Sequence, residues 1–369
     1  MRILIVSNGY GEDQIACRLA TALQSAVSNS DLIALPLVGP GLSYQTLGIP
    51  LLLTNPALPS GGFIRSFSDA VQDIRAGLFT QVFKQLGAVK NIGHIDLTIS
   101  VGDLFCLSVA RFFNPSEHVF LPTAKSDAFM AHSRLEIALM KRWAKLVFTR
   151  DNLTAESLRE AGVPAHYLGN PMMDGLDPTH QTPTAISTVG LIPGSRQEAY
   201  ENMAYILKVV TEVATLKPTV SWTFAKAPTF DLALFYEKWL KGSSWEIDET
   251  MTLLQHQEQP ISIAIHPDFK LFLASSAVII GLAGTANEQA VYVGKPVICF
   301  EGFGPQSTRT RFLEQGRLLG PQLKLIEPRE KAVIAKAVME ALETTKQQTS
   351  TGELSDAAQK IVKYSLEAS

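Results

Sequence analysis

The amino-acid sequence predicts an α/β protein built from two doubly wound, Rossmann-like domains that face a cleft. Short apolar runs alternate with helical patterns along the chain, which is typical of βα units in a parallel sheet. Glycine-rich turns follow apolar strands in both halves of the chain. The pattern pauses at 175–184, a segment rich in turn-forming residues. We therefore expect one domain at 1–176 and a second at 185–352.

The composition is that of an ordinary globular protein. The chain has 369 residues, of which 46% are hydrophobic and 18% charged, with a formal net charge of -3. Such a charge gives no global reason to expect a nucleic-acid partner. Cys17, Cys106 and Cys299 share no metal-binding or CxxC spacing, so we expect core thiols in a reducing compartment and no metal site.

The N-terminus runs directly into an apolar strand that is too short for a signal peptide. No window approaches the roughly 18 apolar residues that a membrane span needs. These features favour a cytoplasmic enzyme, and a peripheral position on the inner face of a membrane stays open.

The first strand, at 3–6, leads through a glycine turn into a helix at 14–26. Two carboxylates at the start of this helix, Glu12 and Asp13, would repel a pyrophosphate. We therefore expect the loop to face an acceptor hydroxyl or sugar, through Asn8, Gly9, Gly11, Glu12 and Asp13. The alternative for Asp13 is that it caps the helix.

The rest of the first half repeats the strand and helix pattern. A long apolar segment at 63–90 carries interspersed Arg and Lys after a Pro/Gly loop at 55–62, so it either docks on an anionic bilayer or is a core helix. The basic face of a helix at 132–145 leaves the same choice between lipid and solvent. Strands are expected at 32–37, 95–101, 118–121, 146–149 and 165–168, and further helices at 42–47, 104–112 and 154–161.

Asp103 is the candidate general base. It follows Gly102 directly after the strand at 95–101, where doubly wound folds carry catalytic groups. Capping of the next helix is its alternative role. A polar loop at 122–127 ends the following strand at the same edge, which makes Lys125 a second acceptor-side candidate.

The second half restarts with a strand at 188–191, a Pro-Gly-Ser-Arg turn and a helix at 198–213. Arg196 at such a turn suits bidentate binding of a phosphate, with help from the Ser195 hydroxyl. Arg309 and Arg311 either reach a phosphate or are solvated. Strands are expected at 221–225 and 261–265, and helices at 232–240, 268–274, 329–345 and 355–366.

A βαβ unit at 277–300 organises this half. Its glycine turn, Gly281 to Gly284, opens a helix whose free amides can bind a diphosphate. A plain crossover, with glycines that only shape the turn, is the alternative. The candidate donor-binding residues here are Gly284, Thr285, Ala286, Asn287, Glu288 and Gln289, the last two toward a ribose or sugar hydroxyl.

Three motifs together resemble lipid-A-disaccharide synthase, and more closely its lipid-A-disaccharide-synthase-related branch. They are residues 191–196 with Glu198 and Asn202, residues 169–174, and residues 284–290 with 294–297. The resemblance covers nearly the whole chain and implies a GT-B glycosyltransferase, metal-independent and inverting. It implies a UDP-sugar donor such as UDP-N-acetylglucosamine as co-substrate, no cofactor, and a lipid acceptor at the membrane surface.

By motif, the resemblance implies that Ser195 and Arg196 bind the diphosphate, that Gly284 and Thr285 bind phosphates, and that Asp103 is the base. It also implies that a C-terminal helix within 353–369 crosses back onto the N-terminal domain. The family's acid in the 284–290 helix falls at Gln289 here, with Glu288 one place earlier. The loops at 8–13 and 122–127 also depart from the family pattern, so the acceptor stays open.

Three functions follow as hypotheses. The first is transfer of a hexosyl unit from a UDP-sugar to a hydroxyl of a lipid-linked acceptor. The second is a UDP-sugar epimerase, since those enzymes share the fold. The third is a non-catalytic UDP-sugar-binding partner of another transferase.

Overall fold

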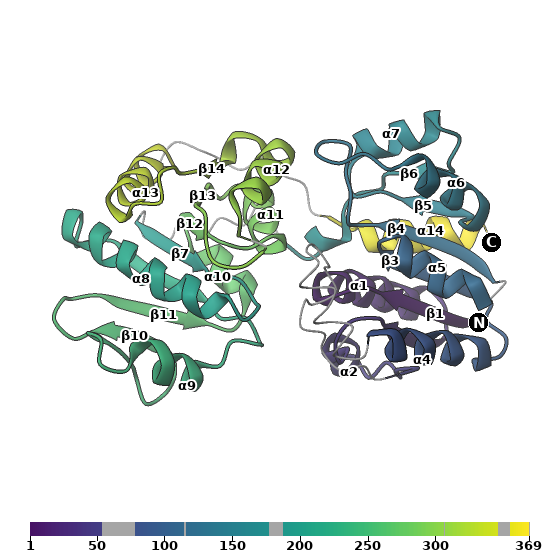
Figure 1. Cartoon of the computed structure of the whole chain (residues 1–369), viewed down its shortest axis with the longest axis horizontal. Helices are drawn as coiled ribbons and strands as arrows, with labels where there is room; N and C mark the ends of the chain where they lie inside the picture. Colours follow the sequence, from purple (N-terminus) through teal and green to yellow (C-terminus); the bar gives the residue numbers. More distant parts are fainter. Residues whose placement is uncertain (54–77, 114–115, 177–186, 306, 346–354, 369) are drawn as a thin grey trace. The chain divides into compact units, whose positions relative to one another are not determined.

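Alternating apolar strands and amphipathic helices build two β-sheets, one all-parallel and one mainly parallel (Figure 1). The structure, a computed structural model, describes residues 1–53, 78–113, 116–176, 187–305, 307–345 and 355–368. The chain divides into an N-terminal unit, Met1–Asp174 with Ser355–Ser369, and a C-terminal unit, Gly175–Leu354. The sequence-based bounds of 1–176 and 185–352 lie close to this division.

The sheet of the N-terminal unit has six strands, all parallel, in the order β2-β1-β3-β4-β5-β6. The strand order reverses between β1 and β3, and such a switch point is where open α/β sheets bind ligands. The strands are β1 (Arg2–Ser7), β2 (Asp31–Pro36), β3 (Leu97–Gly102), β4 (Glu117–Pro122), β5 (Leu146–Phe148) and β6 (Ala165–His166).

Helices cover both faces of this sheet because successive strand residues point to opposite sides. Ile3 and Ile5 of β1 join a cluster with α1 and α14, whereas Leu4 and Val6 join a cluster with α4 and α5. The helices of the unit are α1 (Tyr10–Ala26), α2 (Leu42–Thr46), α4 (Leu78–Asn91), α5 (Leu104–Phe113), α6 (Arg134–Trp143), α7 (Asn152–Glu160) and α14 (Ala357–Glu367).

The last helix, α14, belongs to the N-terminal unit, as the resemblance implies (Figure 1). The carboxylate of Asp174 accepts the N–H groups of Ala357 and Ala358 at 2.9 and 2.7 Å, which fixes the start of α14. Gly169 has φ of +101°, and a Cβ there would lie 2.9 Å from the Ala357 side chain. Residues 169–174, preceded by β6 and containing the short 3-10 helix Pro171–Met173, therefore form the docking site of α14.

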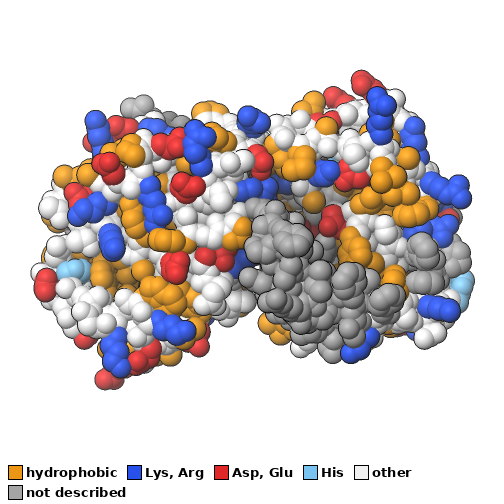
Figure 2. All heavy atoms as spheres, viewed as in Figure 1, with side chains coloured by type: hydrophobic (Ala, Val, Ile, Leu, Met, Phe, Trp, Pro, Cys, Tyr) orange, Lys and Arg blue, Asp and Glu red, His pale blue; other side chains and the backbone are white. Residues whose placement is uncertain are grey.

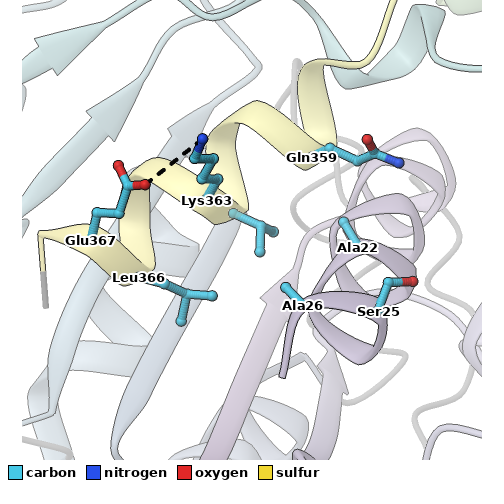
Figure 3. Close-up of a pocket in the computed structure, with 8 residues that line it drawn as sticks. Ala22, Ser25, Ala26, Gln359, Lys363, Leu366 and Glu367 are labelled. Carbon is cyan, nitrogen blue, oxygen red and sulfur yellow. Dashed lines mark ion pairs between the residues drawn. The ribbon is translucent and has the colours of Figure 1, made fainter. Parts of the chain in front are cut away.

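Further along, α14 runs beside α1, and a groove lies between them (Figure 3). Ala22 and Ala26 of α1 and Leu366 of α14 line it, and Lys363 pairs with Glu367 at 3.9 Å. Because α1 begins at the carboxyl ends of the strands and these residues end it, the groove lies toward the opposite edge of the sheet.

The sheet of the C-terminal unit has eight strands in the order β14-β13-β12-β7-β8-β11-β10-β9. Its strands are parallel except for β10, which pairs antiparallel with both of its neighbours, β11 and β9. The order reverses between β7 and β12. The strands are β7 (Thr188–Ile192), β8 (Ser221–Ala225), β9 (Trp245–Ile247), β10 (Leu253–His256), β11 (Ser262–His266), β12 (Val278–Gly281), β13 (Val297–Cys299) and β14 (Leu323–Leu325).

On this sheet, α13 packs against α8, β12 and β13, whereas α10 packs against β7, β8 and β11. The structure adds elements that the sequence pattern did not predict: β9, β10, β14 and α12. The segment predicted as one helix at 232–240 is a short α-helix followed by a π-helix. The helices are α8 (Ala199–Leu216), α9 (Leu232–Phe235), η2 (Tyr236–Leu240), α10 (Phe269–Ser275), α11 (Thr285–Tyr292), α12 (Arg309–Leu319), η3 (Gly320–Gln322) and α13 (Lys331–Thr345).

The predicted loop at 55–62 and most of the segment at 63–90 lie outside the described residues, which resume with α4 at Leu78. Within the described part of the chain, no helix is long and apolar enough to cross a membrane. The three cysteines are buried free thiols, as predicted.

Candidate functional site

The switch point of the N-terminal unit brings Asn8 and Asp103 together. Asn8 follows β1 and Asp103 follows β3, and these strands are neighbours. The Asn8 side-chain amide donates to Asp103 Oδ2 at 2.9 Å. Two residues that are 95 positions apart in the sequence therefore meet at the expected edge.

Asp103 also binds the first turn of α5. Its Oδ1 accepts the N–H groups of Phe105 and Cys106 at 2.9 and 3.3 Å. Burial raises the pKa of this carboxyl, against the hydrogen bonds from Cys106, Phe105 and Asn8 that lower it. Oδ1 thus caps α5, which is the alternative role of Asp103, whereas Oδ2 lies at the switch point beside Asn8.

Gly102 allows this close approach. It has φ of +142°, and a Cβ there would lie 2.9 Å from Cys106 Sγ and 3.0 Å from Asn8 Cβ. An L side chain rarely adopts that backbone conformation. Gly102 is therefore required both by its dihedral angle and by the contact between the two loops.

The predicted loop at 8–13 is shorter than expected because α1 begins at Tyr10. Gly9 is the N-cap residue, with φ of 130° and no side-chain cap, and Gly11 lies within the helix. A Cβ on Gly9 would lie 2.9 Å from Glu12 Oε2, and Glu12 Oε1 accepts the hydroxyl of Thr123 at 3.3 Å. Glu12 thus links the start of α1 to the loop after β4.

Asp13 is buried and neither caps α1 nor reaches solvent. Its side chain is 2% exposed, and Ser7 Oγ donates to its Oδ1 at 2.6 Å. The Tyr44 hydroxyl lies 2.7 Å from Ser7 Oγ and extends this buried chain. Burial raises the pKa of Asp13 to about 7, partly offset by the Ser7 bond and supported by the charge of Glu12.

Lys125 is tied to the start of α6. Its Nζ lies 2.8 Å from Glu136 Oε2, which also accepts the Ser133 N–H at 2.7 Å as part of a capping box. The predicted acceptor-side role of this lysine would therefore need the Glu136 pair to open.

In the C-terminal unit, the loops after β7 and β12 meet at the switch point. The Leu282 N–H donates to the Ile192 carbonyl at 2.7 Å. Gly194 has φ of +111°, and Ser195 is exposed with its carbonyl bound by the Thr229 hydroxyl at 2.6 Å. Arg196 is half-buried beside it.

The start of α11 faces the same edge without a side-chain cap. Its N-cap residue is Gly284, and the helix begins at Thr285, followed by Ala286. The caps of α6, α7, α10 and α12, by contrast, each accept a backbone N–H with a side-chain oxygen. A helix start without such a cap leaves amide groups and the positive end of the helix dipole for an anion.

The side chain of Asn287 is turned inward and holds the glycine turn. It is fully buried and donates to the Gly281 carbonyl and to Gln315 Oε1, both at 3.2 Å. Glu288 and Gln289 are half-buried in the first turns of the helix. The side chain of Asn287 therefore supports the turn and does not face a ligand.

Buried polar residues that the sequence did not single out as site supports shape these loops. Gln315 of α12 donates to the Gly284 carbonyl at 2.8 Å. Asn202 donates to the Pro193 carbonyl at 3.1 Å and accepts the Phe303 N–H at 2.7 Å, so it ties the loop after β7 to the loop after β13. Their partners are distant in the sequence, so no local pattern signals these roles.

Two predicted phosphate candidates are engaged elsewhere. Arg309 pairs with Glu327 at 2.7 Å, and Arg311 pairs with Glu314 at 2.9 Å. Both guanidinium groups are thus held in ion pairs, whereas Arg196 follows β7 at the C-terminal switch point.

The fold is GT-B: two Rossmann-like sheets with helices on both faces and a last helix that returns to the first unit. No protein-family model and no curated protein matches the sequence.

Solved structures share this fold at low sequence identity. Neisseria meningitidis UDP-GlcNAc 2-epimerase, solved with UDP-GlcNAc, matches with a TM-score of 0.61 and 14% identity over 100% of both chains. S. aureus MnaA, solved with UDP, matches with a TM-score of 0.60 and 17% identity over 100% of this chain and 97% of that one. Acinetobacter baumannii MurG matches with a TM-score of 0.55 and 12% identity over 99% of each chain. These likenesses establish the fold alone.

Proposed function

We propose that the protein transfers a hexosyl unit from a UDP-sugar, such as UDP-N-acetylglucosamine, to a hydroxyl of a lipid-linked acceptor. The observation that carries the proposal is the C-terminal switch point. There the Ser195–Arg196 turn follows β7 and the uncapped start of α11 follows the neighbouring strand β12. That arrangement suits two linked phosphates. Structures of the same fold contain UDP and UDP-GlcNAc, which supports a nucleotide-sugar donor.

On the donor side, amide groups at Gly284, Thr285 and Ala286 would bind phosphate oxygens, and Arg196 would bind them bidentately. Glu288 and Gln289, in the next positions of the helix, would bind ribose or sugar hydroxyls. Charge that develops on the leaving UDP is then stabilised by groups that are already oriented, so no divalent metal is needed for this step.

On the acceptor side, Asp103 would take the proton of the attacking hydroxyl. The acceptor oxygen forms a bond to the anomeric carbon while the bond from that carbon to the diphosphate oxygen breaks, which inverts the anomeric configuration and releases UDP. A pKa raised by burial brings this carboxylate closer to the working pH, where a general base is most effective.

Replacing Asp103 tests this assignment. We expect Asp103→Asn to lower UDP release from UDP-sugar with membrane lipid extract by about 100-fold or more, which is the usual contribution of a general base. UDP binding should stay within about twofold, because Asp103 belongs to the acceptor side. Unchanged turnover in Asp103→Asn would remove this residue from the mechanism, and loss of UDP binding would indicate a structural role instead.

A UDP-sugar epimerase is the second candidate, because one of the neighbours named above is a UDP-GlcNAc 2-epimerase. In this case the carboxyl of Asp103 would act on the sugar ring itself. NMR of UDP-N-acetylglucosamine incubated in D2O without acceptor separates the two functions. A C2 epimer that carries deuterium supports the epimerase, and UDP release only with lipid acceptor supports the transferase. UDP binding without either product would indicate a non-catalytic partner.

A further inference from the structure

The solvent-exposed face of α6 combines cations with an exposed apolar side chain. Arg134, Leu135, Ala138, Lys141 and Arg142 are all exposed and recur at the spacing of one helical stripe. We call these five residues the α6 face. Leu135 is 66% exposed, although the opposite side of the helix, with Met140 and Trp143, packs into the core. The α6 face is thus amphipathic without being covered by the N-terminal unit.

All charged residues of the α6 face are cationic. Arg134, Lys141 and Arg142 form no ion pair with any residue that the structure describes. The single acid of the helix, Glu136, is turned toward Lys125 and the Ser133 amide. In a chain with a net charge of -3, one short helix therefore carries three cations that have no ion-pair partner among the described residues.

Two further exposed apolar residues follow strands of the same sheet, one after β4 and one after β3. Met130, in the loop between β4 and α6, is 43% exposed, and Phe105, two residues after Asp103, is 40% exposed. Figure 2 shows hydrophobic side chains beside Lys and Arg on the unit that holds α6. Because β4 leads into α6, the start of this helix lies near the edge that carries Asp103.

We propose that the α6 face binds an anionic lipid bilayer. Interfacial helices bury Leu and similar side chains at the headgroup boundary while Lys and Arg contact anionic lipids. This inference rests on the proposed function, because a lipid-linked acceptor lies in a membrane. Binding through the α6 face would bring the edge of the sheet that carries Asp103 to that membrane. A soluble polyanion would use the cations alone and would leave Leu135 and Met130 without a partner.

Co-sedimentation of the full chain with vesicles tests the proposal. We expect the wild type to bind phosphatidylcholine vesicles that contain phosphatidylglycerol, with binding that weakens as salt rises. Reversal of the three cations in Arg134→Glu/Lys141→Glu/Arg142→Glu should lower the partition coefficient on the order of a hundredfold. Leu135→Ser should also lower vesicle binding while leaving retention on double-stranded DNA unchanged.

A matched control is the triple variant Lys208→Glu/Lys238→Glu/Lys336→Glu, which makes the same change in net charge at exposed lysines of the C-terminal unit. It should bind vesicles within about twofold of the wild type if the α6 face, rather than net charge, is responsible. Equal loss of binding in both triple variants would overturn the proposal. So would a wild type that stays in the supernatant, an α6 variant that binds as the wild type does, or DNA retention without vesicle binding.

Protection against heat by UDP separates this proposal from the function on which it rests. The α6 variants should keep the protection of the wild type, because α6 and the donor side belong to different units. If the wild type does not bind vesicles but UDP still protects it against heat, only the proposal that the α6 face binds a bilayer is contradicted. Vesicle binding without any UDP protection would contradict the transferase instead.

Discussion

Asp13 shows how a carboxyl that looks functional in the sequence serves a buried network. It follows a glycine turn at a strand end, yet it is 2% exposed and bound by Ser7, which in turn contacts Tyr44. The sequence does not predict this buried network, because Tyr44 comes from α2, 31 residues further along the chain. The burial of Asp13 has a measurable consequence for stability.

Asp13→Asn should change how stability depends on pH. The folded pKa of about 7 lies above the model-peptide value of 3.8, so the folded state binds more protons between these values. The contribution of Asp13 is therefore fully present below about pH 4 and is lost as pH rises to about 7, by up to about 4 kcal/mol. We expect the variant to match the wild type at pH 4 and to be more stable at pH 8, as measured by urea unfolding.

Glu160→Gln is the control for this comparison, since Glu160 is an exposed acid of the same unit. Its stability difference from the wild type should not vary with pH by more than about 0.5 kcal/mol. A pH-independent difference between Asp13→Asn and the wild type would show that burial does not raise the folded pKa of Asp13.

Gly102→Ala tests the contact between the two loops of the N-terminal switch point. The added Cβ would meet Asn8 and Cys106 at 3.0 and 2.9 Å, at φ of +142°. We expect a loss of about 2 to 4 kcal/mol in unfolding free energy, from backbone strain and overpacking together. Gly48→Ala, at φ of +68° with no atom within 4 Å of the added Cβ, should cost about 1 kcal/mol. Equal costs at both positions would mean that the loops do not approach as described.

At the scale of elements, α11 and α12 act as a pair. The glycine turn and the helix start at Thr285 are predictable because the pattern of an apolar strand, glycines and a helix is local. The support from α12 is not, because the sequence 309–319 is too polar to show a buried stripe, and its one buried amide, Gln315, reaches back 31 residues to Gly284. The same holds for the β9 and β10 hairpin, whose three- and four-residue strands are too short for a clear alternation.

Gln315→Ala should loosen the turn that presents the α11 amides. It removes the hydrogen bond to the Gly284 carbonyl and the acceptor for Asn287. We expect a three- to tenfold weaker affinity for UDP by calorimetry, equivalent to roughly 1 kcal/mol, with the fold retained. Arg317→Ala, at an exposed position of the same helix, should leave the affinity unchanged. An unaltered affinity in Gln315→Ala would mean that the turn keeps its shape without α12.

Across the whole molecule, the chain completes most of the N-terminal unit, builds the C-terminal unit, and returns to the N-terminal unit for its last helix. Composition and periodicity predict two doubly wound domains, but they do not indicate where the last helix docks. That expectation came from the resemblance, and its physical basis is now visible in Asp174 and Gly169, which receive the start of α14. Residues 169–174, one of the motifs that carry the resemblance, thus have a structural role in joining the ends of the N-terminal unit.

The two switch points carry different chemical groups. This difference is why we assign acceptor activation to the N-terminal one and donor binding to the C-terminal one. The N-terminal one holds the carboxyls of Glu12 and Asp103, and the C-terminal one holds Arg196 and an uncapped helix start. The sequence predicts this difference because each loop directly follows its strand. It does not predict which side chains turn inward, as Asp13 and Asn287 do, because that depends on contacts from other elements.

Calorimetric titration of UDP into the wild type and Arg196→Ala tests whether the C-terminal switch point binds a diphosphate. We expect the wild type to bind UDP and Arg196→Ala to bind it at least about tenfold more weakly, because a bidentate charge-assisted contact to the diphosphate is lost. Arg311→Ala, whose guanidinium is paired with Glu314, should bind as the wild type does. A wild type that does not bind UDP, or an Arg196→Ala variant with unchanged affinity, would contradict a diphosphate site at the C-terminal switch point.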